Sequence, residues 1–371
     1  MQKKIYFENL DASRFFAFLL VFLAHCFISE DEYVKTSDSF NAMYNWGKIG
    51  VLGLEYFFVL SSFLISSIIL EEKKQRNSFH LKNFLIRRSL RVWPLYFLIL
   101  LIGFFAITAG NMLQVPVSPL PPWPYLLFFV INFYIIQFGS EFLFFIAILW
   151  SISVEEQFYL IWSLFMKFLN LRFDLFCWLL IVISIAFRIY YQDDDSALYF
   201  HTVSTLGNFG IGGLLAWGIH SRSKFISIVS AFSRKAVIAI YLILVLSIIF
   251  YHQLMEIAAF QPFSRCYFSL LFAYLILDQT MGQNRLFNMG RYQLINYLGK
   301  ISYGLYCLHG VVVTLMILLL RQSLFKEGLL LSLFVLPLVI FLLSVLLSHL
   351  SYRYFEQYFL RLKERFYTFR P

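Results

Sequence analysis

Long apolar runs recur from one end of the chain to the other, and they constrain its fold more than any other feature. About 20 mainly apolar residues suffice for a helix to cross the core of a bilayer. Among the 371 residues, 60% are hydrophobic and only 14% are charged, which is not the composition of a soluble domain. The sequence therefore predicts an all-α, polytopic membrane protein. The apolar runs cover Ala12–Ile28, Val51–Leu70, Val92–Ala109, Tyr125–Phe138, Leu143–Phe168, Leu175–Tyr190, Val203–Ile219, Ala236–Tyr251, Cys266–Thr280, Ile301–Leu320 and Leu329–Leu350.

The charges of the loops predict which runs cross the membrane. Basic residues gather in alternate loops, beginning with Lys3 and Lys4 and the stretch Glu71–Arg91, and positive loops stay in the cytoplasm. Tyr125–Phe138 is too short for a span and is expected to be re-entrant or interfacial. We therefore expect a bundle of about ten transmembrane helices with both termini cytoplasmic. Its net charge of +9 reflects this topology, so no nucleic-acid partner is predicted.

The predicted domain organisation is simple. Residues 1–350 are expected to form a single transmembrane domain, with no soluble domain and no long linker. Residues 351–371 are expected to form a cytoplasmic amphipathic tail on the inner leaflet, because their aromatic residues fall on one helical face.

The first apolar run carries three ionisable side chains, Asp11, Arg14 and His25. At about 100° per residue, Arg14 and His25 fall within about 20° of one helical face, roughly 16 Å apart along the axis. Asp11 falls about 40° to the other side of His25. Ionisable groups inside a membrane need partners and are functional candidates by default. We therefore expect a polar stripe along this helix.

His25 is the candidate base, because a neutral imidazole accepts a proton from a hydroxyl nucleophile. Glu155 and Glu156 lie within a predicted span, about 100° apart on a helix. One carboxylate is expected to orient His25, while the other pairs with an arginine. The alternatives are a structural histidine and a salt bridge that holds the bundle together. Glu55 is a further intramembrane carboxylate.

Two other groups have both a functional and a structural interpretation. Arg87, Arg88 and Arg91 are spaced to form one cationic face, which suits either a phosphate-bearing ligand or ordinary cytoplasmic anchoring. His309 shares a helical face with Ser302 and Tyr306, which suits either catalysis or polar packing between helices.

Other patterns indicate packing rather than chemistry. Four glycines between Gly207 and Gly213 stand in an apolar run without a preceding strand, so they predict close helix contacts rather than a nucleotide loop. The four cysteines are scattered singly, so neither a disulfide framework nor a metal site is expected.

Together these segments resemble the acyltransferase 3 family of integral membrane acyltransferases along nearly the whole chain. The stretch from Leu10-Asp-Ala-Ser-Arg14 to His25 is similar to the opening motif of that family, although Ala12-Ser13 replaces the usual Gly-Leu. The second-helix motif is matched with Glu55 where Asp is usual and Ser62 where Gly is usual. The remaining matches are Arg88-Ser-Leu-Arg91, Trp150-Ser-Ile-Ser-Val-Glu-Glu-Gln-Phe-Tyr159, Ser302-Tyr-Gly-Leu-Tyr-Cys-Leu-His309 and Ser351-Tyr-Arg-Tyr-Phe-Glu356.

The resemblance implies an O-acyltransferase, most often an O-acetyltransferase, that modifies a sugar hydroxyl of a bacterial surface polysaccharide. Acetyl-CoA would be the acyl donor, a glycan or lipid-linked sugar the acceptor, and the bacterial inner membrane the location. Arg14, Arg88 and Arg91 would bind the donor, and His25, Glu155, Glu156 and Asp11 would be catalytic. His309, Ser302 and Glu55 are further candidates, and no metal is expected. His25 would act either as the general base or as a transient carrier of the acyl group. The sugar and its hydroxyl, the acyl chain, the side of the membrane on which transfer occurs and the oligomeric state stay open. A transporter or flippase of a glycan intermediate and a non-catalytic scaffold are the alternatives.

Overall fold

The computed structural model describes residues 8–112, 119–168, 172–321 and 327–366. Within these ranges all regular elements are helical, which confirms the predicted all-α class. Lys3, Lys4 and the last five residues of the predicted tail lie outside the described ranges. The long helices are α1 (Glu8–Leu23), α4 (Val51–Arg76), α5 (Leu81–Met112), α9 (Trp150–Phe168), α10 (Phe173–Tyr190), α12 (Thr202–His220), α14 (Arg234–Ile249), α16 (Ser264–Met281), α18 (Ser302–Arg321) and α19 (Leu336–Ser351).

Short helices connect the long ones. They are α2 (Glu32–Lys35), α3 (Asp38–Gly47), α6 (Trp123–Leu127), α7 (Ile131–Phe138), α8 (Phe144–Ala147), α11 (Asp195–Phe200), α13 (Lys224–Ser230), α15 (Tyr251–Met255), α17 (Gln293–Lys300) and α20 (Gln357–Lys363). Turns of 3-10 or π type cover Lys48–Gly50, Gln261–Phe263, Met289–Arg291, Leu331–Val335, Tyr352–Glu356 and Glu364–Phe366.

Six helical stretches of the described chain are long and apolar enough to cross a bilayer, or seven if α13 and α14, bent by 89°, are one span. The helix α1 has only 16 residues, below the about 17 that a span needs. The count of ten spans and the cytoplasmic termini therefore stay predictions. The six stretches are Asp38–Arg76, Leu81–Gly110, Phe144–Phe168, Phe173–Tyr190, Ser302–Arg321 and Leu331–Phe366.

The segment that was expected not to span is broken into two short helices, α6 and α7. Phe129 separates them with a φ of 55°, a conformation that interrupts a helix. Neither helix, of five and eight residues, has the length of a span.

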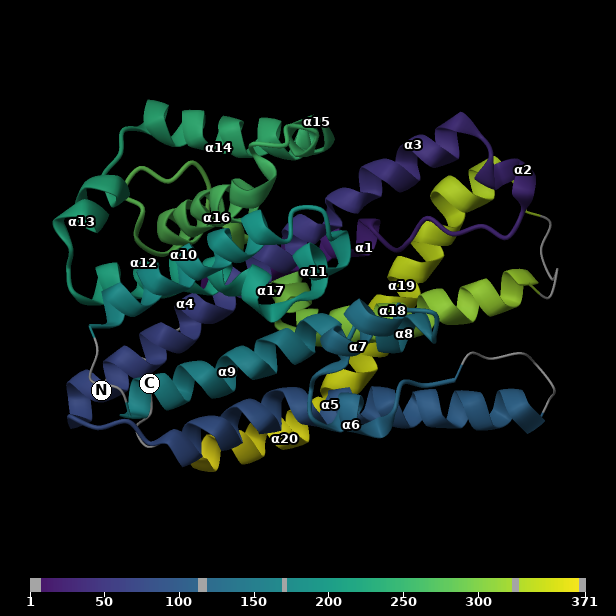
Figure 1. Cartoon of the computed structure of the whole chain (residues 1–371), viewed down its shortest axis with the longest axis horizontal. Coiled ribbons are helices and arrows are strands. Elements are labelled where there is room, and N and C mark those ends of the chain that lie inside the picture. Colours follow the sequence, from purple (N-terminus) through teal and green to yellow (C-terminus); the bar gives the residue numbers. More distant parts are fainter. Residues whose placement is uncertain (1–7, 113–118, 169–171, 322–326, 367–371) are drawn as a thin grey trace.

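The helix α1 lies inside the bundle, where it packs against α4, α16, α17 and α18 (Figure 1). A second contact region joins α12 to α4 and α10. A Cβ on Gly210 would lie 2.7 Å from the carbonyl oxygen of Cys177, and one on Gly212 would overlap the carbonyl oxygen of Val59. The close packing predicted for the glycine-rich segment is therefore confirmed.

The tail continues α19 rather than starting a separate unit. Leu331–Phe366 is one helical stretch with π turns at Leu331–Val335 and Tyr352–Glu356. Its last part, α20, lies along α5 (Figure 1). The position of this tail on the inner leaflet stays a prediction.

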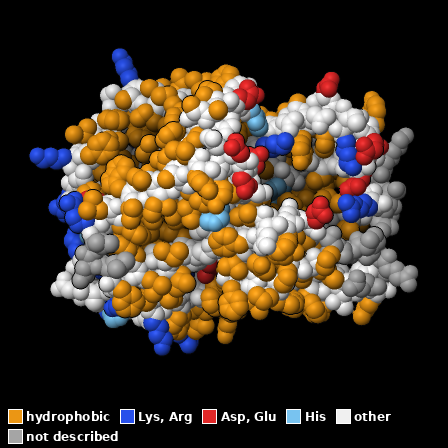
Figure 2. Space-filling view, viewed as in Figure 1, with side chains coloured by type: hydrophobic (Ala, Val, Ile, Leu, Met, Phe, Trp, Pro, Cys, Tyr) orange, Lys and Arg blue, Asp and Glu red, His pale blue; other side chains and the backbone are white. Residues whose placement is uncertain are grey.

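Hydrophobic side chains cover most of the molecular face in Figure 2. Lys and Arg side chains project from the end of this face near α13, and Asp and Glu side chains, together with further Lys and Arg side chains, lie toward its middle and opposite end. A face that is mostly apolar, with charged side chains mainly toward its ends, is the surface expected of a protein in a bilayer.

Candidate active site

His25 lies in a turn after α1 rather than on the helix. The helix ends at Leu23, and the His25 N–H donates to the carbonyl oxygen of Phe22, three residues earlier, at 3.0 Å. This tighter turn rotates His25 away from the regular helical repeat. The helix that carries Arg14 therefore ends two residues before His25, and the stripe predicted to join the two residues on one helical face stays a prediction.

His309, on α18, is the side-chain partner of His25. Its Nε2 lies 3.0 Å from Nδ1 of His25, and the two rings stack with 5.3 Å between their centroids. His309 is fully buried, between Phe18 and Tyr306, whereas His25 is partly accessible and has Phe144 against its edge. The sequence pattern that joined Ser302, Tyr306 and His309 thus marks a face directed to the site.

The backbone around His309 fixes the protons of the pair. Nδ1 of His309 lies 2.6 Å from the carbonyl oxygen of Tyr306 and 3.1 Å from that of Leu305. Carbonyl oxygens only accept hydrogen bonds, so this nitrogen carries the proton and, in the neutral ring, Nε2 is an acceptor. Nδ1 of His25 therefore donates to it. The proton-free nitrogen of a neutral His25 is then Nε2, which has its lone pair available as a base.

The two carboxylates predicted to orient His25 have other surroundings. Glu156 accepts a 2.8 Å hydrogen bond from the indole N–H of Trp93, and Glu155 lines an internal cavity. The orientation of His25 by Glu155 or Glu156 is therefore corrected to orientation by His309. Sequence spacing alone does not pair residues from two distant helices.

A cavity of about 110 Å³ brings Arg14, Arg88 and Arg91 together with Glu155 and Ser302. Five helices contribute to it, namely α1, α4, α5, α9 and α18. Three guanidinium groups and one carboxylate leave a net positive lining that suits a polyanionic ligand. The resemblance implied that these three arginines bind one ligand, and the cavity brings them together.

Specific contacts hold two of these arginines. Arg14 forms an ion pair with Asp11, one helical turn before it on α1. Arg88 lies over the rings of Phe84 and Tyr159, 5.6 Å from each centroid. Stacked and paired guanidinium groups keep their orientation, which favours a bidentate contact with phosphate.

Arg87 does not belong to the cationic face predicted for residues 87–91. Its guanidinium group lies 3.6 Å from the carboxylate of Glu72 and donates to the carbonyl oxygen of Phe366 at 2.8 Å. It is buried and joins α4, α5 and the tail. A structural role therefore explains Arg87, because its donors are directed away from the cavity.

One helix carries both the cavity wall and the histidine partner. Ser302 and Tyr306 line the cavity, and the ring of Tyr306 lies 5.8 Å from that of His309 one turn further along α18. The Tyr306 hydroxyl donates to the carbonyl oxygen of Ile148 and contacts Ser151 at 2.6 Å. The arginine cavity and the histidine pair are thus neighbours along α18.

Sequence reasoning missed several polar residues of the cavity. Ser61 and Tyr159 hydrogen-bond to each other at 2.8 Å, and Ser151 joins Tyr306. Ser151 and Tyr159 stand in the run Trp150–Tyr159, where only the two glutamates were considered. Ser151 and Tyr159 each lie four residues from Glu155, on the same helical face, and this spacing was the available signal.

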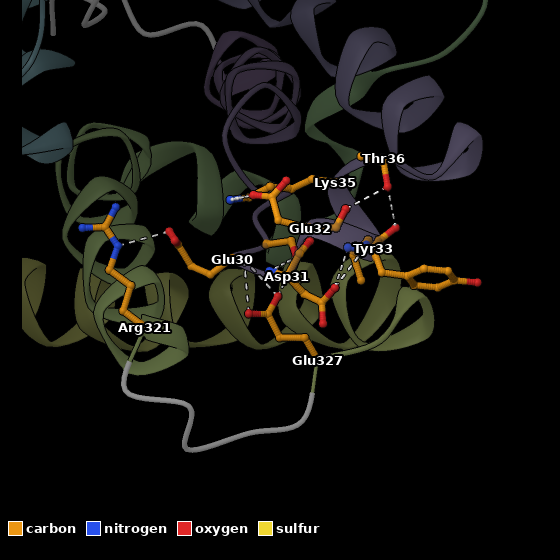
Figure 3. A network of polar contacts seen from close by, with 10 residues as sticks. Glu30, Asp31, Glu32, Tyr33, Lys35, Thr36, Arg321 and Glu327 are labelled. Carbon is orange, nitrogen blue, oxygen red and sulfur yellow. Dashed lines mark hydrogen bonds and ion pairs between the residues drawn. The ribbon is translucent and has the colours of Figure 1, made fainter.

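The segment after His25 is anchored by a polar network at one end of the bundle (Figure 3). The carboxylate of Glu327 accepts hydrogen bonds from the Ser29 hydroxyl at 2.6 Å and from the Glu30 N–H at 3.0 Å. Arg321, at the end of α18, pairs with Glu30 at 3.2 Å. These contacts tie the chain just beyond His25 to the helices that carry and follow His309.

Glu55 does not join either group. Its carboxylate lies 3.8 Å from Nε of Arg265 and lines a second cavity with Arg188. Glu55 therefore belongs to a cavity separate from the arginine cavity and from the histidine pair.

The match to known families covers this whole arrangement. A family model described as an acyltransferase domain matches residues 7–353, which include both histidines, all three cavity arginines and both cavities. The chain belongs to this acyltransferase family. The resemblance inferred from the motifs is thereby confirmed.

Two relatives of this chain are named as O-acetyltransferases. The peptidoglycan O-acetyltransferase OatA of Listeria monocytogenes is 24% identical over an alignment of 302 residues that covers 75% of this chain and 47% of that protein. The O-acetyltransferase OatA of Staphylococcus aureus is 26% identical over an alignment of 378 residues that covers 95% of this chain and 57% of that protein. The chain thus spans about half the length of these curated relatives. No solved structure matches it.

Proposed function

We propose that this protein is a membrane O-acyltransferase that moves an acetyl group from acetyl-CoA to a hydroxyl group of a cell-surface polysaccharide. The observation that carries the proposal is the histidine pair beside the arginine cavity. This arrangement places a base, the imidazole of His25, near a site that suits the phosphate groups of CoA. Acyl transfer from CoA requires both. The named activities of the relatives support the acetyl group and the glycan acceptor.

In this proposal the arginine cavity holds the phosphate groups of CoA. Arg14, Arg88 and Arg91 supply forked donors at the end of the bundle from which the nucleotide would enter. The pantetheine arm would then run past Tyr306 toward His25. Asp11 keeps the Arg14 side chain in place, so its role is positioning rather than proton transfer.

Nε2 of His25 takes the proton of the acceptor hydroxyl while the oxygen attacks the thioester carbonyl carbon. The carbon–sulfur bond breaks, and the proton passes from His25 to the departing CoA thiolate. The products are an O-acetyl ester and CoA, so atoms and charge balance. General-base catalysis contributes about 10²- to 10⁴-fold, and placement of the two substrates supplies the rest.

His309 keeps His25 in the productive tautomer through the 3.0 Å contact. Glu155 faces the arginines across the cavity and is placed to balance their charge when the donor has left. Ser302 and Tyr306 line the path between the cavity and the histidines. The inner membrane of a bacterium is the proposed location.

The proposal is tested by expressing the full chain in membranes and supplying acetyl-CoA labelled in the acetyl group. Mass spectrometry of the host glycan should detect one acetyl group per modified sugar. His25→Ala should abolish the product while insertion into the membrane persists. His220→Ala is the control, because His220 lies at the far end of α12 and pairs only with Glu71 in the described structure. Movement of a glycan across the membrane without any acetyl ester would contradict the proposal and favour a transporter.

A further inference from the structure

A second cavity, separate from the arginine cavity, lies between α4, α10, α11, α15 and α16. Its volume is about 400 Å³. Glu55, Arg188, Arg265, Tyr199 and Tyr251 are its principal polar and aromatic residues. Figure 2 shows acidic and basic side chains close together near the middle of the face, in the area where α11 lies in Figure 1.

Glu55 has an unused acceptor atom in this cavity. The residue is 5% exposed, and its Oε1 lies 3.8 Å from Nε of Arg265. Its Oε2 is buried and has no hydrogen-bond partner among the described residues. A buried carboxylate oxygen without a donor costs free energy, so a ligand that brings a donor to it gains affinity.

The two arginines of this cavity have different roles. All the donor nitrogens of Arg188 are satisfied by the chain: by the carbonyl oxygens of Leu198, Gln261 and Pro262 and by the hydroxyls of Ser204 and Ser264. Arg265 donates from Nη2 to the carbonyl oxygens of Leu198 and Tyr199, and no hydrogen bond of its Nη1 is found within the described ranges. Arg188 therefore builds the cavity, whereas Arg265 and Glu55 offer it one donor and one acceptor.

The charge of this cavity excludes the kind of ligand that suits the arginine cavity. Two arginines face Glu55 and the exposed Asp195, so positive and negative charges are balanced. A phosphate group here would meet the free oxygen of Glu55. A neutral ligand with hydroxyl groups fits, because neighbouring hydroxyls can donate to Glu55 and accept from Arg265.

Aromatic rings complete a lining suited to sugars. Tyr199 and Tyr251 present amphipathic rings, which combine an apolar face with a hydroxyl. Polar and charged residues make up about half of the lining, and aromatic and aliphatic side chains make up the rest, so the wall can meet both the hydroxyls and the C–H groups of a ligand. A pyranose ring offers the matching chemistry, with apolar C–H faces and equatorial hydroxyls.

The second cavity lies close to both parts of the candidate active site. Val51 lines it, and the preceding residue, Gly50, packs so closely on α1 that a Cβ there would lie 2.6 Å from Cβ of Ala24, the neighbour of His25. The ring of Tyr199 lies 5.1 Å from that of Trp150, next to Ser151 in the arginine cavity. The wall of this cavity is thus connected by packing to the turn that holds His25 and to the helix that lines the arginine cavity.

We propose that the cavity around Glu55 and Arg265 is the binding site for a neutral sugar unit of the acyl acceptor. The proposal rests on the acyl-transfer function proposed above and assigns its second substrate a separate site. Glu55 accepts a hydrogen bond from a sugar hydroxyl, Arg265 donates one, and Tyr251 packs against the ring. The donor and the acceptor then reach the histidine pair from two cavities of different charge.

The test measures sugar binding and acetyl transfer with the same full-length protein in detergent micelles. The probes for binding are the methyl glycosides of glucose, galactose, N-acetylglucosamine and rhamnose, observed by saturation-transfer NMR. At least one should bind the wild-type protein. Glu55→Gln should weaken that binding roughly tenfold or more, because it removes a charged hydrogen-bond acceptor. Tyr251→Ala should also weaken sugar binding. Because Tyr251 is partly exposed, this variant should fold even if the buried Glu55→Gln substitution disturbs the fold.

Asp278→Asn is the matched control for Glu55→Gln. Asp278 is a buried carboxylate of α16, but Tyr241 and Gln279 donate to it outside the cavity. This variant should bind the sugar as the wild type does. Equal binding by the wild type, Glu55→Gln and Tyr251→Ala, or no binding of any probe, would overturn the proposal.

Kinetics separate this inference from the proposed function. In acetyl transfer, Glu55→Gln should raise the KM for the acceptor roughly tenfold or more and leave the KM for acetyl-CoA unchanged. If the wild-type protein is active and the KM for the acceptor is unchanged in Glu55→Gln and Tyr251→Ala, the proposed acceptor site is overturned but the proposed function is not. Wild-type protein that binds a sugar but transfers no acetyl group would instead contradict the proposed function.

Discussion

Nε2 of His309 lies 3.0 Å from Nδ1 of His25, and the carbonyl oxygen of Tyr306 lies 2.6 Å from the other nitrogen of His309. This chain of contacts runs from the backbone of α18 to the accessible nitrogen of His25. It adds a partner to the histidine that the sequence proposed as the base, and it gives a task to His309, for which the sequence left catalysis and polar packing open. His25 is the proposed base, and His309 is its positioning residue.

Replacing His309 tests this assignment. His309→Gln places an amide oxygen near the position of Nε2 and can still accept from His25, whereas His309→Leu cannot. We expect kcat to fall about tenfold for the glutamine variant and about 10²-fold or more for the leucine variant, with little change in KM. Steady-state kinetics with acetyl-CoA and the acceptor measure this. Equal losses in both variants would show that His309 acts only through packing.

Arg88 and Arg91 are expected to bind the donor. Arg88→Ala and Arg91→Ala should each raise the KM for acetyl-CoA about tenfold or more, because each loses a charge-assisted contact with phosphate. Arg88→Lys should recover only part of this, since an ammonium group lacks the guanidinium fork. Arg172→Ala is the control, as Arg172 is exposed and pairs with Asp174 away from the cavity.

A donor that lacks the 3′-phosphate of CoA extends the arginine test. If one arginine contacts that phosphate, its alanine variant should discriminate less between the two donors than the wild type does. If the wild type and both variants prefer acetyl-CoA over the shortened donor to the same extent, the arginines do not bind that phosphate and act in packing or membrane orientation.

Glu327 is expected to affect catalysis from a distance. Glu327→Ala removes the hydrogen bonds to Ser29 and Glu30, so the turn that holds His25 loses its anchor (Figure 3). We expect kcat to fall severalfold while the KM for acetyl-CoA stays constant. Arg321→Ala removes only an exposed ion pair with Glu30, worth about 0–1 kcal/mol, and should have a smaller effect. A larger loss in the arginine variant would contradict the anchor.

Two glycines offer a test of the helix packing. Gly212→Ala should destabilise the fold by about 1–3 kcal/mol, because its Cβ would overlap the backbone of Val59. Gly328→Ala should be nearly neutral, since no atom lies within 4 Å of the added carbon. The fraction of protein that stays monodisperse after heating in detergent measures both. Equal stability of the two variants would show that α12 can move away from α4.

The sequence by itself determined the helical class, the close packing at the glycine-rich segment and the grouping of Arg14 with Arg88 and Arg91. These inferences succeed because they rest on the lengths of the apolar runs, on glycines within apolar helices and on arginines that lie near the same end of their spans. Each of these is a property of one segment, or of all the segments together. The candidate residues were also recognisable from the sequence, since ionisable groups in apolar runs are costly.

Only the tertiary structure decided which candidates are partners. It ended α1 at Leu23, so that His25 lies in the turn after the helix, and it joined His25 to His309 instead of Glu155 or Glu156. It also directed Arg87 to Glu72. Helical periodicity determines the direction of a side chain around its own axis, but the distance between two helices depends on how the whole bundle packs. The contact between His25 and His309, 284 positions apart, is therefore a property of the fold.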